Sequence, residues 1–111
     1  MGNECRGSVL GAGKVDRMSS AASKRHMGKV AALGCILCRN QGNPWTPAQV
    51  HHIREGVGAS QRQSDFLTVP LCLEHHTGAG GLHGLGVRGF YTRYKLDELD
   101  LLSMTIEALE S

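Results

Sequence analysis

The side chains of this chain that could do chemistry are mainly its four cysteines and six histidines. Cys35 and Cys38 are separated by two residues, and Cys72 and His75 repeat that spacing further along. Each two-residue gap lets a tight turn present both ligand atoms to one ion, and two such pairs complete the tetrahedral shell that zinc prefers. The spacing therefore predicts a structural Zn²⁺ site made of these four residues.

Two other interpretations of Cys35 and Cys38 are a redox-active pair and buried free thiols. A redox pair is expected between a strand and a helix of a thioredoxin-like fold, and the surrounding sequence does not have that pattern. Zinc also fits the composition, because five aromatic residues and 15 glycines indicate a thin core. A structural zinc ion can contribute on the order of 10 kcal/mol to the folding of a small domain.

The histidines form a second pattern. His51 and His52 are adjacent at the end of a predicted strand, so their side chains point to opposite faces and have different roles. His76 follows the zinc ligand, and His83 lies seven residues further on. One histidine of the pair can bind a metal while the other takes a proton from water. A lone histidine is usually a surface or core residue, but this group predicts an open metal site beside a general base.

Short elements are expected to position these residues. Apolar residues at helical spacing predict a helix over 20–33, which ends at Gly34. The segments 48–53 and 66–71 have the composition of two strands, and Pro70 puts the second at an edge or strand end. The sequence therefore predicts a small α+β fold.

The C-terminal half is expected to contain a loop and a final helix. Six glycines between residues 78 and 89 predict a loop or a series of turns, followed by a short helical piece over 90–95. Asp97 can cap a helix of about 97–110, which carries an acidic charge. Its apolar face is expected to consist of Leu99, Leu102, Ile106 and Leu109. Residues 1–20 are expected to be a flexible tail, and 21–111 one domain.

Charge and hydropathy narrow the choice of partners. The net charge is +2, but all 12 Lys and Arg lie before residue 96, whereas the last 16 residues contain five acidic residues and no basic one. A basic body is compatible with a polyanionic partner and also with an ordinary solvated surface. The longest apolar run, residues 30–38, is too short to span a bilayer, and the N-terminus lacks the apolar stretch of a secretory signal. We therefore expect no membrane partner and a cytoplasmic location.

The order of these motifs resembles a known group of enzymes. The matching segments are Pro47–Arg54, Ser60–Arg62, Thr68–Gly78 and Leu82–His83, preceded by the Cys35–Cys38 pair. They are similar to the HNH nucleases, also called ββα-metal or His-Me finger nucleases. More closely, they resemble the phage recombination enhancement function (Ref) nucleases, whose members work with RecA. The resemblance covers about residues 25–95.

The resemblance implies a small ββα-metal domain with a structural zinc knuckle and flanking helices. It implies that His51 and His76 bind a catalytic divalent ion (Mg²⁺, Mn²⁺ or Zn²⁺), that His83 completes this site, and that His52 is the general base. The middle Asn of the HNH motif is missing, because no Asn lies between His52 and His76. Thr68 is about where that Asn would be, and Gln61 and Asp65 are other candidates.

The function implied by the resemblance is hydrolysis of phosphodiester bonds in DNA, in partnership with a RecA–DNA filament and without a small-molecule cofactor. Arg54 and Arg62 lie between the strands, where such nucleases approach DNA, and could hold phosphates. The alternative is a non-catalytic zinc module that binds nucleic acid or a protein. Such a module has no need of His51, His52, His76 and His83 together, so the number of bound ions distinguishes the two.

Overall fold

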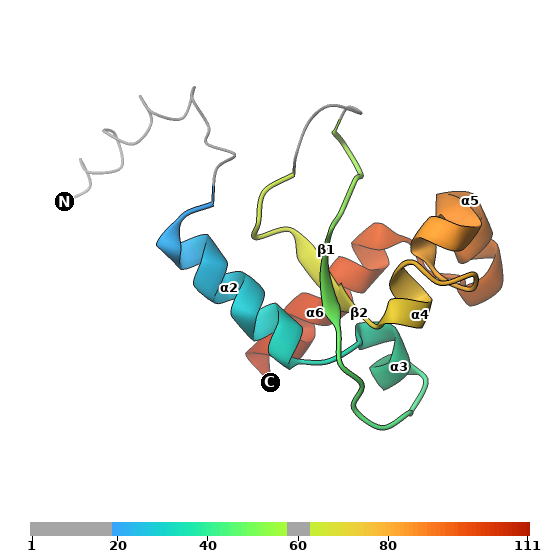
Figure 1. The fold of residues 1–111 in the computed structure, drawn as a ribbon, viewed down its shortest axis with the longest axis horizontal. Coiled ribbons are helices and arrows are strands. Elements are labelled where there is room, and N and C mark those ends of the chain that lie inside the picture. The colour runs from blue at the N-terminus through green and yellow to red at the C-terminus, as the bar shows by residue number, and fades with distance from the viewer. Residues whose placement is uncertain (1–18, 58–62) are drawn as a thin grey trace.

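Two short antiparallel strands lie at the middle of the fold, with helices around them (Figure 1). The computed structural model describes residues 19–57 and 63–111. Almost all of the predicted tail, together with Gln61 and Arg62, lies outside these ranges. The helices are α2 (Ala21–Ala32), α3 (Ile36–Asn40), α4 (Leu73–His76), α5 (Leu82–Tyr94) and α6 (Glu98–Glu110), and the strands are β1 (Gln49–His52) and β2 (Thr68–Leu71). The predicted small α+β class is confirmed.

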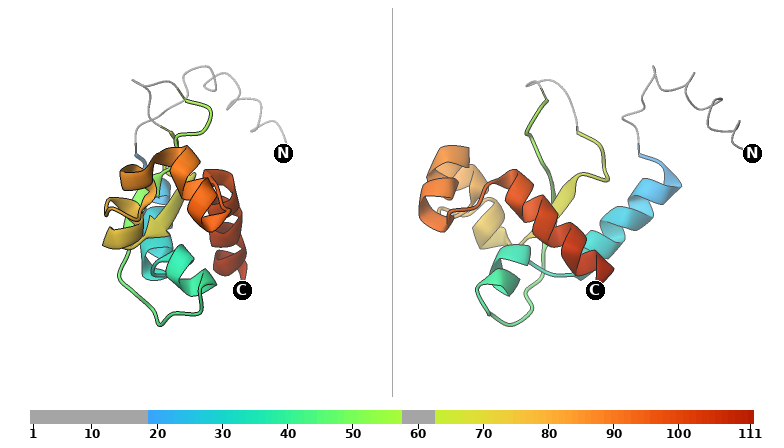
Figure 2. Two further views of the ribbon diagram at one scale, coloured as in Figure 1. Left: turned by 90° about the vertical axis from the view of Figure 1, so that its right-hand side faces the viewer. Right: turned by 180° about the vertical axis from the view of Figure 1, so that it is seen from behind.

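The sheet sets the directions of the two adjacent histidines. In the β1–β2 pairing, His51 lies opposite Val69 and His52 opposite Thr68. Every residue of β2 is buried, whereas β1 is more exposed. Helices α2 and α6 both contact β2, and from behind α6 is seen to cross in front of the strands (Figure 2). His51 lies beside Glu98 of α6, and His52 lies beside Asp65, which accepts a hydrogen bond from Ser23 in the first turn of α2.

Helix α2 begins and ends within one residue of the predicted bounds. Ser20 and Ser23 form a capping box at its start. Just beyond its end, Gly34 has a φ of +78°, and a Cβ there would lie 2.4 Å from the Trp45 ring nitrogen. Only glycine fits this position without strain. The turn expected at Cys35–Cys38 is a short helix, α3, with Cys35 at its N-cap.

The loop expected over residues 78–89 is wrong from Leu82 onward. Helix α5 already begins at Leu82, and it is kinked at Gly86, where φ is +79°. A Cβ on Gly84 would lie 2.2 Å from the carbonyl oxygen of Gly78, so the glycine lets this helix pack directly on the preceding turn. Glycine disfavours helix by about 1 kcal/mol per residue, and close tertiary packing outweighs that preference here.

The final helix has the predicted cap, and its buried face differs only in part from the predicted one, since Leu102 packs against the core as expected. Asp97 and Asp100 form a capping box at its start. Leu99 and Ile106, which were expected on the apolar face, are each 48% exposed, whereas Glu98, Leu101 and Thr105 are buried. The helix packs through Leu101 into the core, and an acidic residue can face inward beside it because partners satisfy its carboxylate. The core consists mainly of Cys35, Ile36, Leu37, Cys38, Ile53, Val69, Leu71, Leu82, Phe90 and Leu101.

Within the described ranges, every helix is too short or too polar to cross a bilayer.

Candidate active site and metal centre

The four residues predicted to bind zinc converge at one point. The Nδ1 atom of His75 lies 3.5 Å from Cys35 Sγ, 3.6 Å from Cys38 Sγ and 3.3 Å from Cys72 Sγ. The sulfurs of Cys38 and Cys72 are 3.8 Å apart. In a tetrahedral zinc site with the usual bond lengths, two sulfur ligands lie about 3.8 Å apart, and a sulfur and a nitrogen ligand lie about 3.5 Å apart. The observed separations therefore match a tetrahedral Cys₃His shell.

The chemistry of this cluster also fits a bound cation. The 3.8 Å between the two sulfurs is far longer than the roughly 2 Å of a disulfide, and all three cysteines are free. Burial raises the pKa of the Cys35 thiol to about 12 and lowers the pKa of His75. A neutral imidazole is ready to act as a ligand, and a metal ion would compensate the buried thiolates.

The three histidines predicted to bind the second ion also lie together, at the junction of β1, α4 and α5. His76 Nε2 is 3.2 Å from His51 Nδ1 and 3.2 Å from His83 Nε2. One ion with zinc–nitrogen bonds and tetrahedral angles would place its nitrogen ligands about 3.3–3.4 Å apart. His51 is buried and His83 is exposed, so the cluster runs from the core to the surface. The structure thus brings together all three predicted ligands.

The far side of two of these rings is held by hydrogen-bond acceptors. His51 Nε2 donates to Glu98 Oε2 at 2.7 Å, and His76 Nδ1 donates to Gln49 Oε1 at 2.8 Å. In the neutral rings, His51 Nδ1 and His76 Nε2 then both carry lone pairs, and these face each other at 3.2 Å. Two facing lone pairs repel each other unless a cation lies between them, so the donor set fits a metal site.

Electrostatics keep His76 available for a metal. Burial, with smaller contributions from His51 and His83, lowers the pKa of His76 from 6.5 to about 4. His76 is therefore neutral at physiological pH. A neutral imidazole is the form that binds metal ions.

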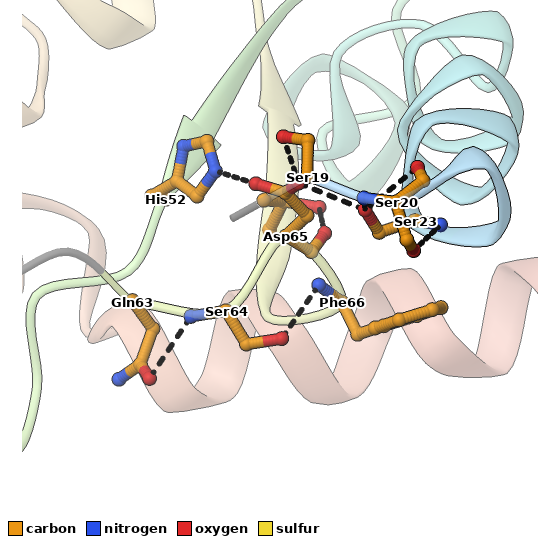
Figure 3. A network of polar contacts seen from close by, with 9 residues as sticks. Ser19, Ser20, Ser23, His52, Gln63, Ser64, Asp65 and Phe66 are labelled. Carbon is orange, nitrogen blue, oxygen red and sulfur yellow. Dashed lines mark hydrogen bonds and ion pairs between the residues drawn. The ribbon is translucent and has the colours of Figure 1, made fainter. Parts of the chain in front are cut away.

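His52 points away from this cluster and is held by a carboxylate of its own. Its Nε2 donates to Asp65 Oδ1 at 2.7 Å, and Asp65 is 5% exposed (Figure 3). The other carboxylate oxygen of Asp65 accepts hydrogen bonds from Ser19 and Ser23 at the start of α2. The His52 side chain is 28% exposed, so it can reach water. Asp65 thus fixes the ring orientation, and in the neutral ring the lone pair is on Nδ1.

Of the candidates for the missing Asn within the described residues, Asp65 is the one whose side chain hydrogen-bonds His52. The Thr68 hydroxyl donates instead to the backbone carbonyl of Asp65 at 3.1 Å. Gln61 and the predicted DNA contact Arg62 lie outside the described residues. Arg54 is exposed just after β1, and its backbone N–H donates to Glu98.

Two contributors to this site, Glu98 and Gln49, were not identified from the sequence. Glu98 is an acid in the first turn of a helix, a position where acids are common because they interact well with the helix dipole. Only its 3% exposure reveals a different role. Burial would raise the pKa of Glu98, but hydrogen bonds from His51 and from the backbone of Arg54 and Glu55 lower it below the usual value. Glu98 is therefore ionised.

Comparison with known protein families finds a match to one family model. The family model described as "Recombination enhancement, RecA-dependent nuclease" matches residues 19–110, which include all the described histidines and cysteines of both clusters. No curated protein matches the sequence.

Proposed function

The chain belongs to the family of recombination enhancement, RecA-dependent nucleases, and we propose that it is a metal-dependent DNA endonuclease of the HNH type. Its general base is His52, and its catalytic ion is bound by His51, His76 and His83. The observation that carries the proposal is the arrangement of β1. On one face of the strand, His51 belongs to the cluster of three histidines. On the other face, the next residue, His52, donates a hydrogen bond to the carboxylate of Asp65.

The three-histidine cluster would hold a divalent ion. When bound, such an ion supplies Lewis-acid stabilisation of the charge that develops on the phosphate and the leaving oxygen. A set of three imidazoles favours a transition ion such as Zn²⁺ over Mg²⁺, which prefers oxygen ligands. The Cys₃His shell has four protein ligands, so we assign it a structural zinc ion.

His52 takes the proton from the attacking water. Its Nδ1 lone pair accepts this proton while Nε2–H remains bonded to Asp65, whose charge stabilises the resulting imidazolium. The water oxygen forms the new bond to phosphorus, and the bond from phosphorus to the 3′ oxygen breaks, with its electron pair moving to that oxygen. Exposed Arg54, together with Arg62, is proposed to hold the DNA backbone without reading sequence.

A nicking assay on plasmid and single-stranded DNA, with and without RecA filaments, tests this assignment. We expect divalent-ion-dependent cleavage by the wild type that is enhanced by RecA, and loss of about 10²–10⁴ in rate for His52→Ala. His26→Ala is the matched control, because His26 is on α2, packs against Phe66 and lies in neither cluster. If His52→Ala folds, keeps its metal content and cuts at the wild-type rate, then His52 is not the base.

Metal analysis separates the nuclease from a non-catalytic zinc module. The proposal predicts two bound ions for each chain, one tightly held and one exchangeable. A single tight zinc with no DNA cleavage would favour the module.

A further inference from the structure

The buried carboxylate of Glu98 joins the C-terminal helix to the histidine cluster. Glu98 is the first residue of α6, is 3% exposed, and lies 47 residues from His51 in the sequence. Oε2 accepts the hydrogen bond from His51 Nε2 at 2.7 Å. Oε1 accepts backbone N–H bonds from Arg54 at 2.7 Å and Glu55 at 3.0 Å. The two oxygens therefore have separate partners, both at the end of β1.

These contacts determine which nitrogen of His51 carries the proton. A carboxylate is only an acceptor, so the ring nitrogen that faces it must be protonated. In the neutral ring, the remaining nitrogen, Nδ1, then holds the lone pair, and Nδ1 is the atom that faces His76 at 3.2 Å. The opposite tautomer would place a proton where a metal ligand is needed and two acceptors against each other at Glu98.

We propose that Glu98 is a positioning residue of the metal centre, which fixes the metal-binding tautomer and ring orientation of His51. This inference rests on the assignment of the three histidines as metal ligands in the proposed function. Partners of this kind usually change metal affinity by 10- to 100-fold when they are removed. Because Oε1 is held by two backbone amides, the carboxylate cannot turn away from the histidine without losing both bonds. Helix α6 therefore contributes to the active site as well as to the core.

Glu98→Gln tests the tautomer directly, because the new side chain has the same shape. The glutamine oxygen is required by the amides of Arg54 and Glu55, which can only donate. The glutamine NH₂ group then faces His51 Nε2, which must become an acceptor, so the proton moves to Nδ1. The variant keeps the packing of Glu98 and blocks the ligand atom. Glu107→Gln is the matched control, because Glu107 is exposed on the same helix and the change removes the same charge.

The experiment uses the full chain labelled with ¹⁵N-histidine, with zinc at the cysteine site. NMR assigns the proton of each ring nitrogen at pH 8, and calorimetry measures Zn²⁺ binding to the histidine site. We expect Nε2–H on His51 in the wild type and in Glu107→Gln, and Nδ1–H in Glu98→Gln with 10- to 100-fold weaker zinc binding. A wild-type protein with Nδ1–H and bare Nε2 on His51 would overturn the proposal, and this result needs no variant to fold.

Wild-type zinc affinity and an unchanged tautomer in Glu98→Gln would also overturn it. Neither readout depends on cleavage of DNA. A wild type that binds the second ion and shows the expected tautomer, but cuts no DNA, would refute the proposed nuclease mechanism and leave the role of Glu98 intact.

Discussion

Replacing Asp65 by asparagine tests how much the proposed base depends on its carboxylate partner. Asp65 Oδ1 accepts the hydrogen bond from His52 Nε2 at 2.7 Å. Oδ2 accepts from the hydroxyls of Ser19 at 2.5 Å and Ser23 at 2.9 Å. In Asp65→Asn, the hydroxyls of Ser19 and Ser23 are expected to donate to the one remaining side-chain oxygen, so the NH₂ group faces His52. Nε2 must then accept, and the proton moves to Nδ1, the atom that is proposed to take the proton from water.

The size of the effect follows from these contacts. A general base contributes about 10²–10⁴ to the rate, or about 3–5 kcal/mol of barrier, so we expect a loss in this range. The loss of a charge-assisted hydrogen bond at this buried position costs about 1.5–3 kcal/mol of folding free energy. Domains of this size are stable by about 5–15 kcal/mol, so the variant is expected to fold. Binding of DNA is expected to change little, because Asp65 is buried.

The assay is single-turnover nicking of plasmid DNA at saturating protein, with far-ultraviolet circular dichroism and metal content measured on the same samples. Ser23→Ala is the control, because it removes one donor to Oδ2 and leaves the bond between Asp65 and His52 in place. We expect it to be less stable but to cut at close to the wild-type rate. If Asp65→Asn folds with its full metal content and cuts as fast as the wild type, the tautomer argument is refuted.

Three further predictions follow from the two clusters and the exposed arginine. Cys72→Ser is expected to weaken zinc binding and to lower the melting temperature, because the ion contributes on the order of 10 kcal/mol to folding in such domains; unchanged zinc content and melting temperature would contradict this. The metal-free protein is expected to lose stability as the pH falls from 6.5 to about 4, because the unfolded chain binds a proton at His76 in this range and the folded chain does not; denaturant titrations at several pH values measure this, and His76→Asn is expected to show a smaller loss. Arg54→Ala is expected to weaken DNA binding and its dependence on salt while cleavage at saturation is unchanged; equal binding of both proteins across a salt series would rule out a phosphate contact.

Much of the fold and of the metal chemistry was predictable because it depends on residues close together in the sequence. The two-residue spacing of Cys35 and Cys38, repeated by Cys72 and His75, allows each pair to bind one ion in a single turn. Adjacent residues of a strand point to opposite faces, so the different surroundings of His51 and His52 follow from their order alone. The caps at Ser20 and Asp97 are likewise local, since each satisfies backbone groups three residues away.

Tertiary structure alone decided how these side chains are held and which faces are buried. Glycine content correctly indicates low intrinsic helix preference, yet α5 begins at Leu82, and Gly84 lets it pack closely on the backbone of Gly78. Asp65 comes to His52, and Glu98 to His51, through packing of elements 13 and 47 residues away in the sequence. A carboxylate near the start of a helix has the same local pattern whether it faces water or a buried histidine. Only the packing of α6 against the sheet separates these cases, because it removes water from Glu98 and provides the three donors that replace it.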